Sequence, residues 1–142
     1  MGDIDAIEAL VYGYAEGIDT GDIAAVVDLF AHATWRSAAR DEVLRDPQSV
    51  RAVYDRIVVY DDGTPRTKHL ITNLVVDVAD DAMTATGRCS YTVLQGVVPG
   101  EPLQVVVAGR YVDRYERGPD GWRFADRLFI VDLSGDQSRH FR

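Results

Sequence analysis

The amino-acid sequence predicts an α+β domain, shaped as a cone, in which three N-terminal helices pack on a long curved antiparallel β-sheet. Up to Pro65 the apolar residues recur with the 3.6-residue period of helices, and beyond it they form β-branched runs joined by turn residues. The helices are expected to cover the concave side of the sheet and to leave an apolar pocket. Residues 1–142 are enough for one domain with a substantial core, and no repeat or linker divides them.

The N-terminal segment is expected to form two helices. Asp3 can cap the first, an amphipathic helix of about four turns that ends near Asp19. Gly21 follows, and a glycine in this place can adopt the left-handed conformation that terminates a helix. Asp22 then caps a second, shorter helix. Asp19 therefore stands where the chain must turn.

The middle of the chain combines a short strand with a third helix. Residues 33–37 are typical of a strand and contain Trp35, and a polar connection follows. Asp46, followed by a proline, is a strong helix start, and this helix is expected to continue to a turn at 61–63. Four strands joined by turns and a loop are then expected at 66–78, 82–95, 103–117 and 122–133. The polar tail after them is expected to cap a sheet edge or to fray.

The composition restricts the partners of this chain. A formal net charge of -8 argues against nucleic acid or an anionic membrane as the main partner, because both favour clustered Lys and Arg. No apolar run approaches the roughly 20 residues of a membrane helix, and the N-terminal residues lack the features of a signal peptide, so a cytoplasmic protein is expected. Cys89 is the single cysteine, and neither metal-ligand spacing nor a phosphate-binding loop is present, so no metal or other cofactor is expected.

His69 is the strongest candidate for chemistry. It begins a β-branched run and shares strand parity with Ile71, so its ring is expected to face the interior. An inward imidazole needs a partner for its second nitrogen, and Asp19 at the end of the first helix can supply it. Such a pair at a pocket would be a general base, whereas the alternative is a core histidine bonded to a backbone carbonyl. His32 and His140 have weaker claims, because one follows a helix and the other lies in the tail.

Three further residues have both a functional and a structural interpretation. Asn73 shares the parity of His69 and can donate to a substrate oxygen or satisfy a strand edge. Trp35 can form a substrate platform or part of the core. Arg127 can stabilise an enolate or a departing anion, or form a surface ion pair among its charged neighbours.

Six segments together resemble the SnoaL-like branch of the nuclear transport factor 2-like superfamily. They cover nearly the whole chain and read YAEGIDTGDIAAVVDLFA at 14–31, TW at 34–35, KHLITNLVVDV at 68–78, ATGRCSYTVLQ at 85–95, AGRYVDRYER at 108–117 and GWRFADR at 121–127. The resemblance implies the cone-shaped α+β fold. It does not select a reaction, because the superfamily includes lyases, isomerases, cyclases, hydrolases and non-catalytic binding modules.

Within that branch the chain is similar to hexachlorocyclohexane dehydrochlorinase and scytalone dehydratase, in which an Asp–His dyad takes a proton from carbon and a leaving group departs. The triplet around Asp19 and the HLITN run that starts at His69 match the motifs of the dehydrochlorinase. The resemblance therefore implies that these two residues form the catalytic dyad. It also implies substrate-binding roles for Tyr14, Trp35 and Arg127.

The residues leave two functions open. The first is a cofactor-independent lyase or isomerase, dehydratase-like or cyclase-like, that abstracts a proton from a small apolar cyclic substrate in the conical pocket. The second is a non-catalytic small-molecule-binding or assembly module of the same fold. In either case a homo-oligomer is expected, a dimer or a trimer, because a long sheet leaves one apolar face that the helices cannot cover.

Overall fold

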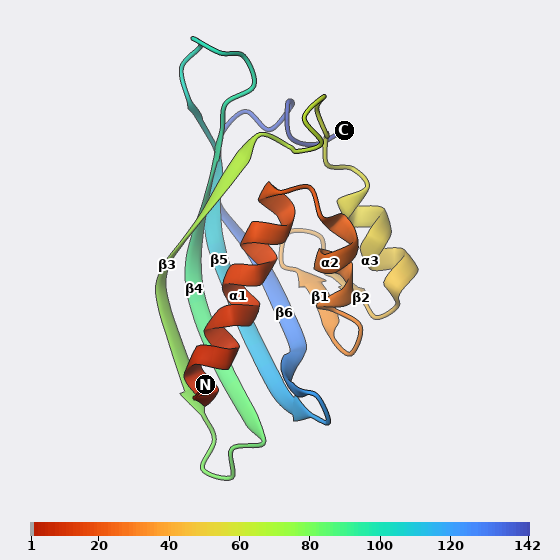
Figure 1. Ribbon diagram of the computed structural model, residues 1–142, viewed down its shortest axis with the longest axis vertical. Coiled ribbons are helices and arrows are strands. Elements are labelled where there is room, and N and C mark those ends of the chain that lie inside the picture. Colours follow the sequence, from red (N-terminus) through yellow and green to blue (C-terminus); the bar gives the residue numbers. More distant parts are fainter. Residues whose placement is uncertain (1) are drawn as a thin grey trace.

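One curved sheet forms the frame of the molecule in the computed structural model, which describes residues 2–142. Its six strands run in the order β2-β1-β6-β5-β4-β3, and helices pack across one face (Figure 1). The described elements are α1 (Asp3–Asp19), α2 (Ile23–Asp28), β1 (Thr34–Ser37), β2 (Glu42–Leu44), α3 (Pro47–Tyr54), β3 (Thr67–Val78), β4 (Thr84–Gln95), β5 (Gln104–Gly118) and β6 (Gly121–Ser134). The predicted α+β class, with N-terminal helices and a long curved sheet, is confirmed.

The four long strands, β3 to β6, form the predicted antiparallel meander, and two short strands extend it. β1 pairs in parallel with β6, and β2 folds back on β1 in antiparallel register. β2 is an element that the sequence did not indicate, because it has three residues and its pairing with β1 alone defines it as a strand. α1 packs on β3 and β6, so the helix crosses the concave face of the sheet (Figure 1).

Local sequence signals set most of the helix starts. The side chains of Asp22 and Asp46 accept hydrogen bonds from backbone N–H groups three residues further on, at 3.2 and 2.8 Å, and thereby cap α2 and α3 as predicted. Asp3 does not cap α1, because Gly2 occupies the cap position. The Asp3 carboxylate instead accepts a hydrogen bond of 2.5 Å from Arg117, which ties the start of α1 to the end of β5.

α3 ends at Tyr54, well short of its predicted end. The residues that follow pair with the C-terminal tail. Ile57 forms a β-bridge with Phe141, and the backbone N–H of Val58 donates to the carbonyl of His140 at 2.8 Å. The tail therefore does not fray: long-range pairing orders it, and the same pairing prevents the helix from continuing.

β-bulges reverse the alternation of faces in the long strands, and two of them lie beside residues that the sequence indicated as site candidates. In β3 the pairing with β4 shifts by one residue between Thr72 and Val75, and Asn73 in this interval has a φ of 55°. In β6 the pairing with β5 shifts in the same way at Ala125. Side chains beyond each bulge therefore face the opposite side from the one that simple alternation predicts.

The convex face of the sheet, turned away from the helices, carries exposed apolar side chains. Leu70, Val112 and Leu133 are 41%, 40% and 70% exposed. This is the face through which the homo-oligomer is expected. The assembly stays a prediction, which light scattering at micromolar protein concentration checks: a dimer or trimer is the expected result, and a monomer contradicts it.

Candidate active site

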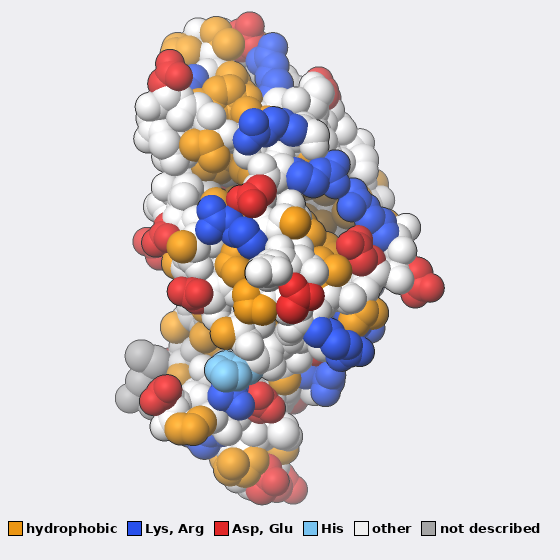
Figure 2. All heavy atoms as spheres, turned by 90° about the vertical axis from the view of Figure 1, so that its right-hand side faces the viewer, with side chains coloured by type: hydrophobic (Ala, Val, Ile, Leu, Met, Phe, Trp, Pro, Cys, Tyr) orange, Lys and Arg blue, Asp and Glu red, His pale blue; other side chains and the backbone are white. Residues whose placement is uncertain are grey.

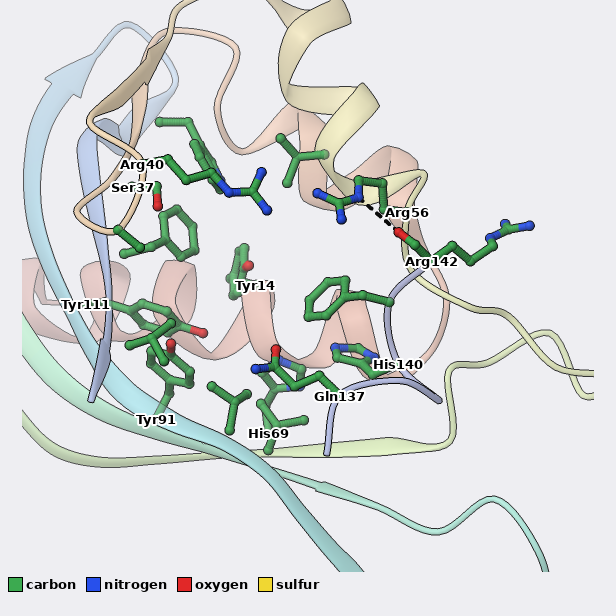
Figure 3. A pocket seen from close by; sticks show the side chains of 18 of the residues that line it. Tyr14, Ser37, Arg40, Arg56, His69, Tyr91, Tyr111, Gln137, His140 and Arg142 are labelled. Carbon is green, nitrogen blue, oxygen red and sulfur yellow. Dashed lines mark hydrogen bonds between the residues drawn. The ribbon is translucent and has the colours of Figure 1, made fainter. Parts of the chain in front are cut away.

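A cavity of about 500 Å³ lies between the concave face of the sheet, α1, α3 and the C-terminal tail (Figure 3). Pockets that hold small organic ligands have volumes of about 300–1,000 Å³, so this one is large enough for a ring compound. Apolar and aromatic side chains form most of its wall: Tyr14, Trp35, Val53, Tyr91, Val93, Val107, Tyr111, Phe129, Val131 and Phe141. The polar side chains of the wall are Ser37, Arg40, Arg56, His69, Gln137, Ser138, His140 and Arg142.

Backbone geometry brings the end of α1 to the start of β3. Gly21 follows the helix with a φ of 77°, and its N–H donates to the carbonyl of Ile18 at 3.0 Å. A Cβ at Gly21 would lie 2.1 Å from the carbonyl oxygen of Gly63, so a glycine is required where the loop before β3 approaches the helix end. Asp19, the last residue of α1, thereby reaches His69, the third residue of β3.

The Asp19 carboxylate holds the His69 ring in one orientation. Its Oδ1 lies 2.6 Å from Nδ1 of His69 and accepts a hydrogen bond of 2.9 Å from the Thr67 hydroxyl. Its Oδ2 accepts the backbone N–H of His69 at 2.8 Å. The side chains of Asp19 and His69 are 15% and 6% exposed. Since Nδ1 is engaged, Nε2 is the ring nitrogen that remains for the cavity, whose wall includes His69.

Asp19 is ionised at neutral pH in this arrangement. Burial raises the pKa of its carboxyl, but the hydrogen bonds from His69 and Thr67 and the attraction to the imidazole outweigh burial and lower the pKa below its usual value. An ionised carboxylate beside Nδ1 favours the tautomer with hydrogen on that nitrogen. The lone pair of Nε2 is then available to accept a proton.

Tyr14 and Trp35, both expected at the pocket, line the cavity and are joined through Tyr54. The two tyrosine hydroxyls lie 2.9 Å apart, and the Trp35 indole N–H donates to the Tyr54 oxygen at 3.0 Å. Burial raises the pKa of both tyrosines, so their hydroxyls stay protonated at neutral pH. When Tyr54 donates to Tyr14, the proton of Tyr14 is available to a ligand oxygen.

His140 is a cavity residue that the sequence did not indicate. It lies close to His69 in the cavity (Figure 3), is 2% exposed, and its Nδ1 has no hydrogen-bond partner within residues 2–142. Burial, followed by the neighbouring His69, lowers its pKa to about 4, so the ring is neutral at neutral pH. The sequence offers a slight signal, an aromatic residue beside the histidine in an otherwise polar tail.

The structure does not bring Asn73 or Arg127 to the cavity wall. Asn73 is exposed at the β3 bulge, because the extra residue there ends the parity that it shares with His69. Arg127 is fully buried, so it is not a surface ion pair: its Nε and Nη2 donate to Asp113 at 2.8 and 2.9 Å. Its guanidinium lies over the ring of Tyr14, 4.7 Å from the ring centre, and Tyr14 in turn lines the cavity.

Within residues 2–142, no group of three or more His, Cys, Asp and Glu side chains is arranged to hold a metal ion. No helix in that range is long and apolar enough to cross a membrane. Two expectations from the sequence stay predictions: that the protein uses no cofactor, and that it is cytoplasmic.

A comparison with known protein families identifies the class. Residues 1–128 match the SnoaL-like domain family. The chain therefore belongs to the SnoaL-like family, within the nuclear transport factor 2-like superfamily, and shares its cystatin-like α+β fold. Among curated proteins, none matches this chain in sequence.

Several solved structures are similar to this chain over most of its length. A protein of unknown function from Mycobacterium tuberculosis is 27% identical, with a TM-score of 0.73 over 91% of this chain and 76% of its own. A candidate scytalone dehydratase from Novosphingobium aromaticivorans is 16% identical, with a TM-score of 0.73 over 94% and 86%. LinA is 19% identical, with a TM-score of 0.69 over 91% and 85%. At such low identity the last two show a shared fold and no more.

Proposed function

We propose that this protein is a cofactor-independent lyase or isomerase that abstracts a proton from carbon in a small, apolar, cyclic substrate. The hydrogen bond between Asp19 and His69 in the wall of an apolar cavity carries this proposal. A ring nitrogen that is oriented by a carboxylate and available to a ligand cavity is the arrangement of a general base. The fold shared with a candidate dehydratase supports a lyase, although a fold alone does not select a reaction.

Asp19 and His69 have separate parts in the proposed proton abstraction. Nε2 of His69 takes the proton from a carbon next to a carbonyl group, or next to the carbon that bears a leaving group, and the ring becomes an imidazolium. The Asp19 carboxylate, 2.6 Å from Nδ1, stabilises that positive charge and keeps the ring in place. The electron pair of the broken C–H bond moves to the carbonyl oxygen as an enolate, or forms a double bond while the leaving group departs with its bonding pair.

Two neutral groups in the cavity are suited to stabilise the enolate oxygen. Tyr14 keeps its hydroxyl proton because burial raises its pKa. When the Tyr54 hydroxyl donates to the Tyr14 oxygen, the Tyr14 hydroxyl can donate its own proton to the substrate. The neutral ring of His140, close to His69, offers an N–H group. Such preorganised donors stabilise charge that develops in the transition state.

Exchange of carbon-bound hydrogen with solvent tests this proposal before the natural substrate is known. The probes are bicyclic ketones such as β-tetralone, which have an acidic C–H next to the carbonyl. They are incubated with the protein in heavy water, and deuterium incorporation is followed by NMR. We expect the wild type to accelerate incorporation and His69→Gln to lose about 10²–10⁴-fold of that acceleration.

His32→Gln is the matched control, because His32 is exposed and lies outside the described cavity wall. This variant should exchange hydrogen at the wild-type rate. Circular dichroism should show the same secondary structure in the wild type and both variants. Equal exchange rates in the wild type and His69→Gln would contradict the proposed function and favour a binding module of the same fold.

A further inference from the structure

The charge around the cavity is opposite to that of the chain. Arg40, Arg56 and Arg142 belong to the cavity wall, and no Asp or Glu is among the described residues that line it. The whole chain has 23 acidic and 15 basic residues, so its composition does not predict such a wall. Figure 2 views the molecule from the side of α3 and the C-terminus, and Lys and Arg side chains gather on the upper half of this face. Local positive charge of this kind attracts an anion.

Arg40 and Arg56 come from separate elements and converge over the cavity. Arg40 lies in the turn between β1 and β2, and Arg56 follows α3. Figure 3 shows their guanidinium groups pointing toward one another, while the side chain of Arg142 points away. The Nε of Arg56 donates to the main-chain oxygen of Arg142 at 3.1 Å, which helps to fix the direction of the Arg56 side chain. Both arginines are exposed, so they mark the solvent side of the cavity.

Arg40 and Arg56 differ from most other arginines of the chain because no carboxylate side chain in the described part of the chain forms a close ion pair with them. Seven arginines hold a carboxylate at 2.5–2.9 Å: Arg36, Arg51, Arg110, Arg117, Arg123, Arg127 and Arg139. The ion pair of Arg40 with Glu42 measures 3.9 Å, and that of Arg66 with Asp62 measures 3.5 Å. Nε of Arg56 is bonded to the main-chain oxygen of Arg142, whereas Nη1 and Nη2 of Arg56 have no partner among residues 2–142 and remain for a ligand. Two like charges that face each other repel, and an anion between them removes that repulsion.

We propose that the ligand of this cavity is a ring compound with a carboxylate group, which Arg40 and Arg56 hold while the apolar rings fill the cavity. A guanidinium presents its N–H groups as a fork that matches the two oxygens of a carboxylate. The aromatic side chains of the wall accept the rings. The position of the reacting carbon near His69 rests on the proposed function, whereas the binding of the carboxylate does not.

Calorimetric titration with three ligands of one shape tests the inference. Naphthoate, naphthamide and naphthylmethylamine place a negative, a neutral and a positive group on the same ring system. We expect the wild type to bind naphthoate about 10–100-fold more tightly than naphthamide, which corresponds to hydrogen bonds with a charged group. The amine should bind most weakly. Added salt should reduce the preference for naphthoate, because it screens exposed charges.

Arg40→Gln and Arg56→Gln should each reduce the preference for naphthoate by about 3–10-fold. The double variant should bind naphthoate and naphthamide with equal affinity. Arg51→Gln is the matched control, because Arg51 is an exposed arginine of α3 outside the described wall and its loss changes the net charge equally. This control should keep the preference of the wild type.

Three results would overturn the inference: equal binding of naphthoate and naphthamide, no saturable binding of naphthoate, or a double variant that keeps the preference. The titration needs no turnover, so it is independent of the hydrogen-exchange assay. A preference for naphthoate that disappears in the double variant supports the inference even where His69→Gln exchanges hydrogen like the wild type, and that combination refutes the proposed function alone.

Discussion

Two aspartates, Asp19 and Asp113, each hold a basic side chain, and the surroundings of each pair assign it a different part. The contacts themselves are alike, with 2.6 Å between Oδ1 of Asp19 and Nδ1 of His69, and 2.8 Å between Oδ1 of Asp113 and Nε of Arg127. The side chains of Asp113 and Arg127 are fully enclosed, and the ring of Tyr111 lies 4.0 Å from the guanidinium. His69 instead lies in a cavity wall. Burial alone does not distinguish a candidate catalytic residue from a core residue. The distinguishing feature is a polar atom that borders a cavity.

The enclosed pair is one part of a hydrogen-bond network between β5 and β6, in which Nη1 of Arg127 has no hydrogen-bond partner within residues 2–142. Asp113 and Arg127 are directly opposite in the register of the two strands. The Oδ2 of Asp113 accepts hydrogen bonds from the Tyr115 hydroxyl at 2.7 Å and from Nη2 of Arg127 at 2.9 Å. Burial opposes the charge of Arg127, but the Asp113 carboxylate outweighs it and raises the pKa of the guanidinium, so Arg127 keeps its charge.

Arg127→Met should cause the largest loss of stability, about 3–5 kcal/mol of unfolding free energy, because it leaves a buried carboxylate without its counter-ion. Chemical denaturation measures the loss. Arg110→Met is the control: Arg110 pairs with Asp132 at 2.9 Å, but the two side chains are 52% and 41% exposed, so the loss should be far smaller than that of Arg127→Met. Similar losses in the two variants would contradict the structural part assigned to the enclosed pair.

His140, on the cavity side, should make stability depend on pH. The pKa of a histidine in the unfolded chain is about 6.5, and that of His140 in the folded protein is about 4. Below pH 6.5 the unfolded chain therefore binds a proton that the folded chain does not. The unfolding free energy should fall by roughly 2–3 kcal/mol as the pH drops to about 4.

Denaturation curves across this range measure the effect, and His140→Gln should flatten the dependence. The contribution of Asp19 occupies a different window, because its folded pKa is lowered and its stabilisation is lost only as the pH falls below the usual carboxyl value of 3.8. The same slope in the wild type and His140→Gln would show that another group titrates in this range.

Tyr14 connects the two regions, because its ring covers Arg127 and also lines the cavity. Tyr14→Phe keeps the ring and removes the hydrogen bond to Tyr54, so the expected loss is the smallest, about 1 kcal/mol of unfolding free energy. Tyr14→Ala should cost several times more, because it opens a cavity and uncovers the guanidinium. Equal losses in the two variants, measured by chemical denaturation, would mean that the hydroxyl and not the ring connects the regions.

The elements that the sequence predicts well have local signals. Asp22 and Asp46 cap their helices through residues three positions away, and Gly21 ends α1 through its own backbone angle. The contact between Asp19 and His69 spans 50 residues, so no local signal joins them. Parity placed the ring on the inner face, its need for a partner indicated Asp19 at the end of the first helix, and the family resemblance implied the same pair.

The residues that the sequence placed incorrectly, or did not indicate, depend on long-range geometry. Asn73 faces outward because of the bulge in β3, and its own residue type is the available signal, since Asn adopts positive φ more readily than most residues. The burial of Arg127 follows from the register shift at Ala125, which only the pairing with β5 defines. His140 reaches the cavity because the tail pairs with Ile57, a contact across the whole second half of the chain.

The hydrogen-exchange rates of Asp19→Asn, His69→Gln and the double variant test most directly whether the two residues act as one unit. Asp19→Asn should stay folded and lose most of the acceleration, because an amide cannot stabilise the imidazolium. His69→Gln should lose about 10²–10⁴-fold, and the double variant should be little slower than the slower single variant, since residues that act as a unit are not additive. Losses that multiply in the double variant, or a wild-type rate in His69→Gln, would contradict a working Asp19–His69 dyad.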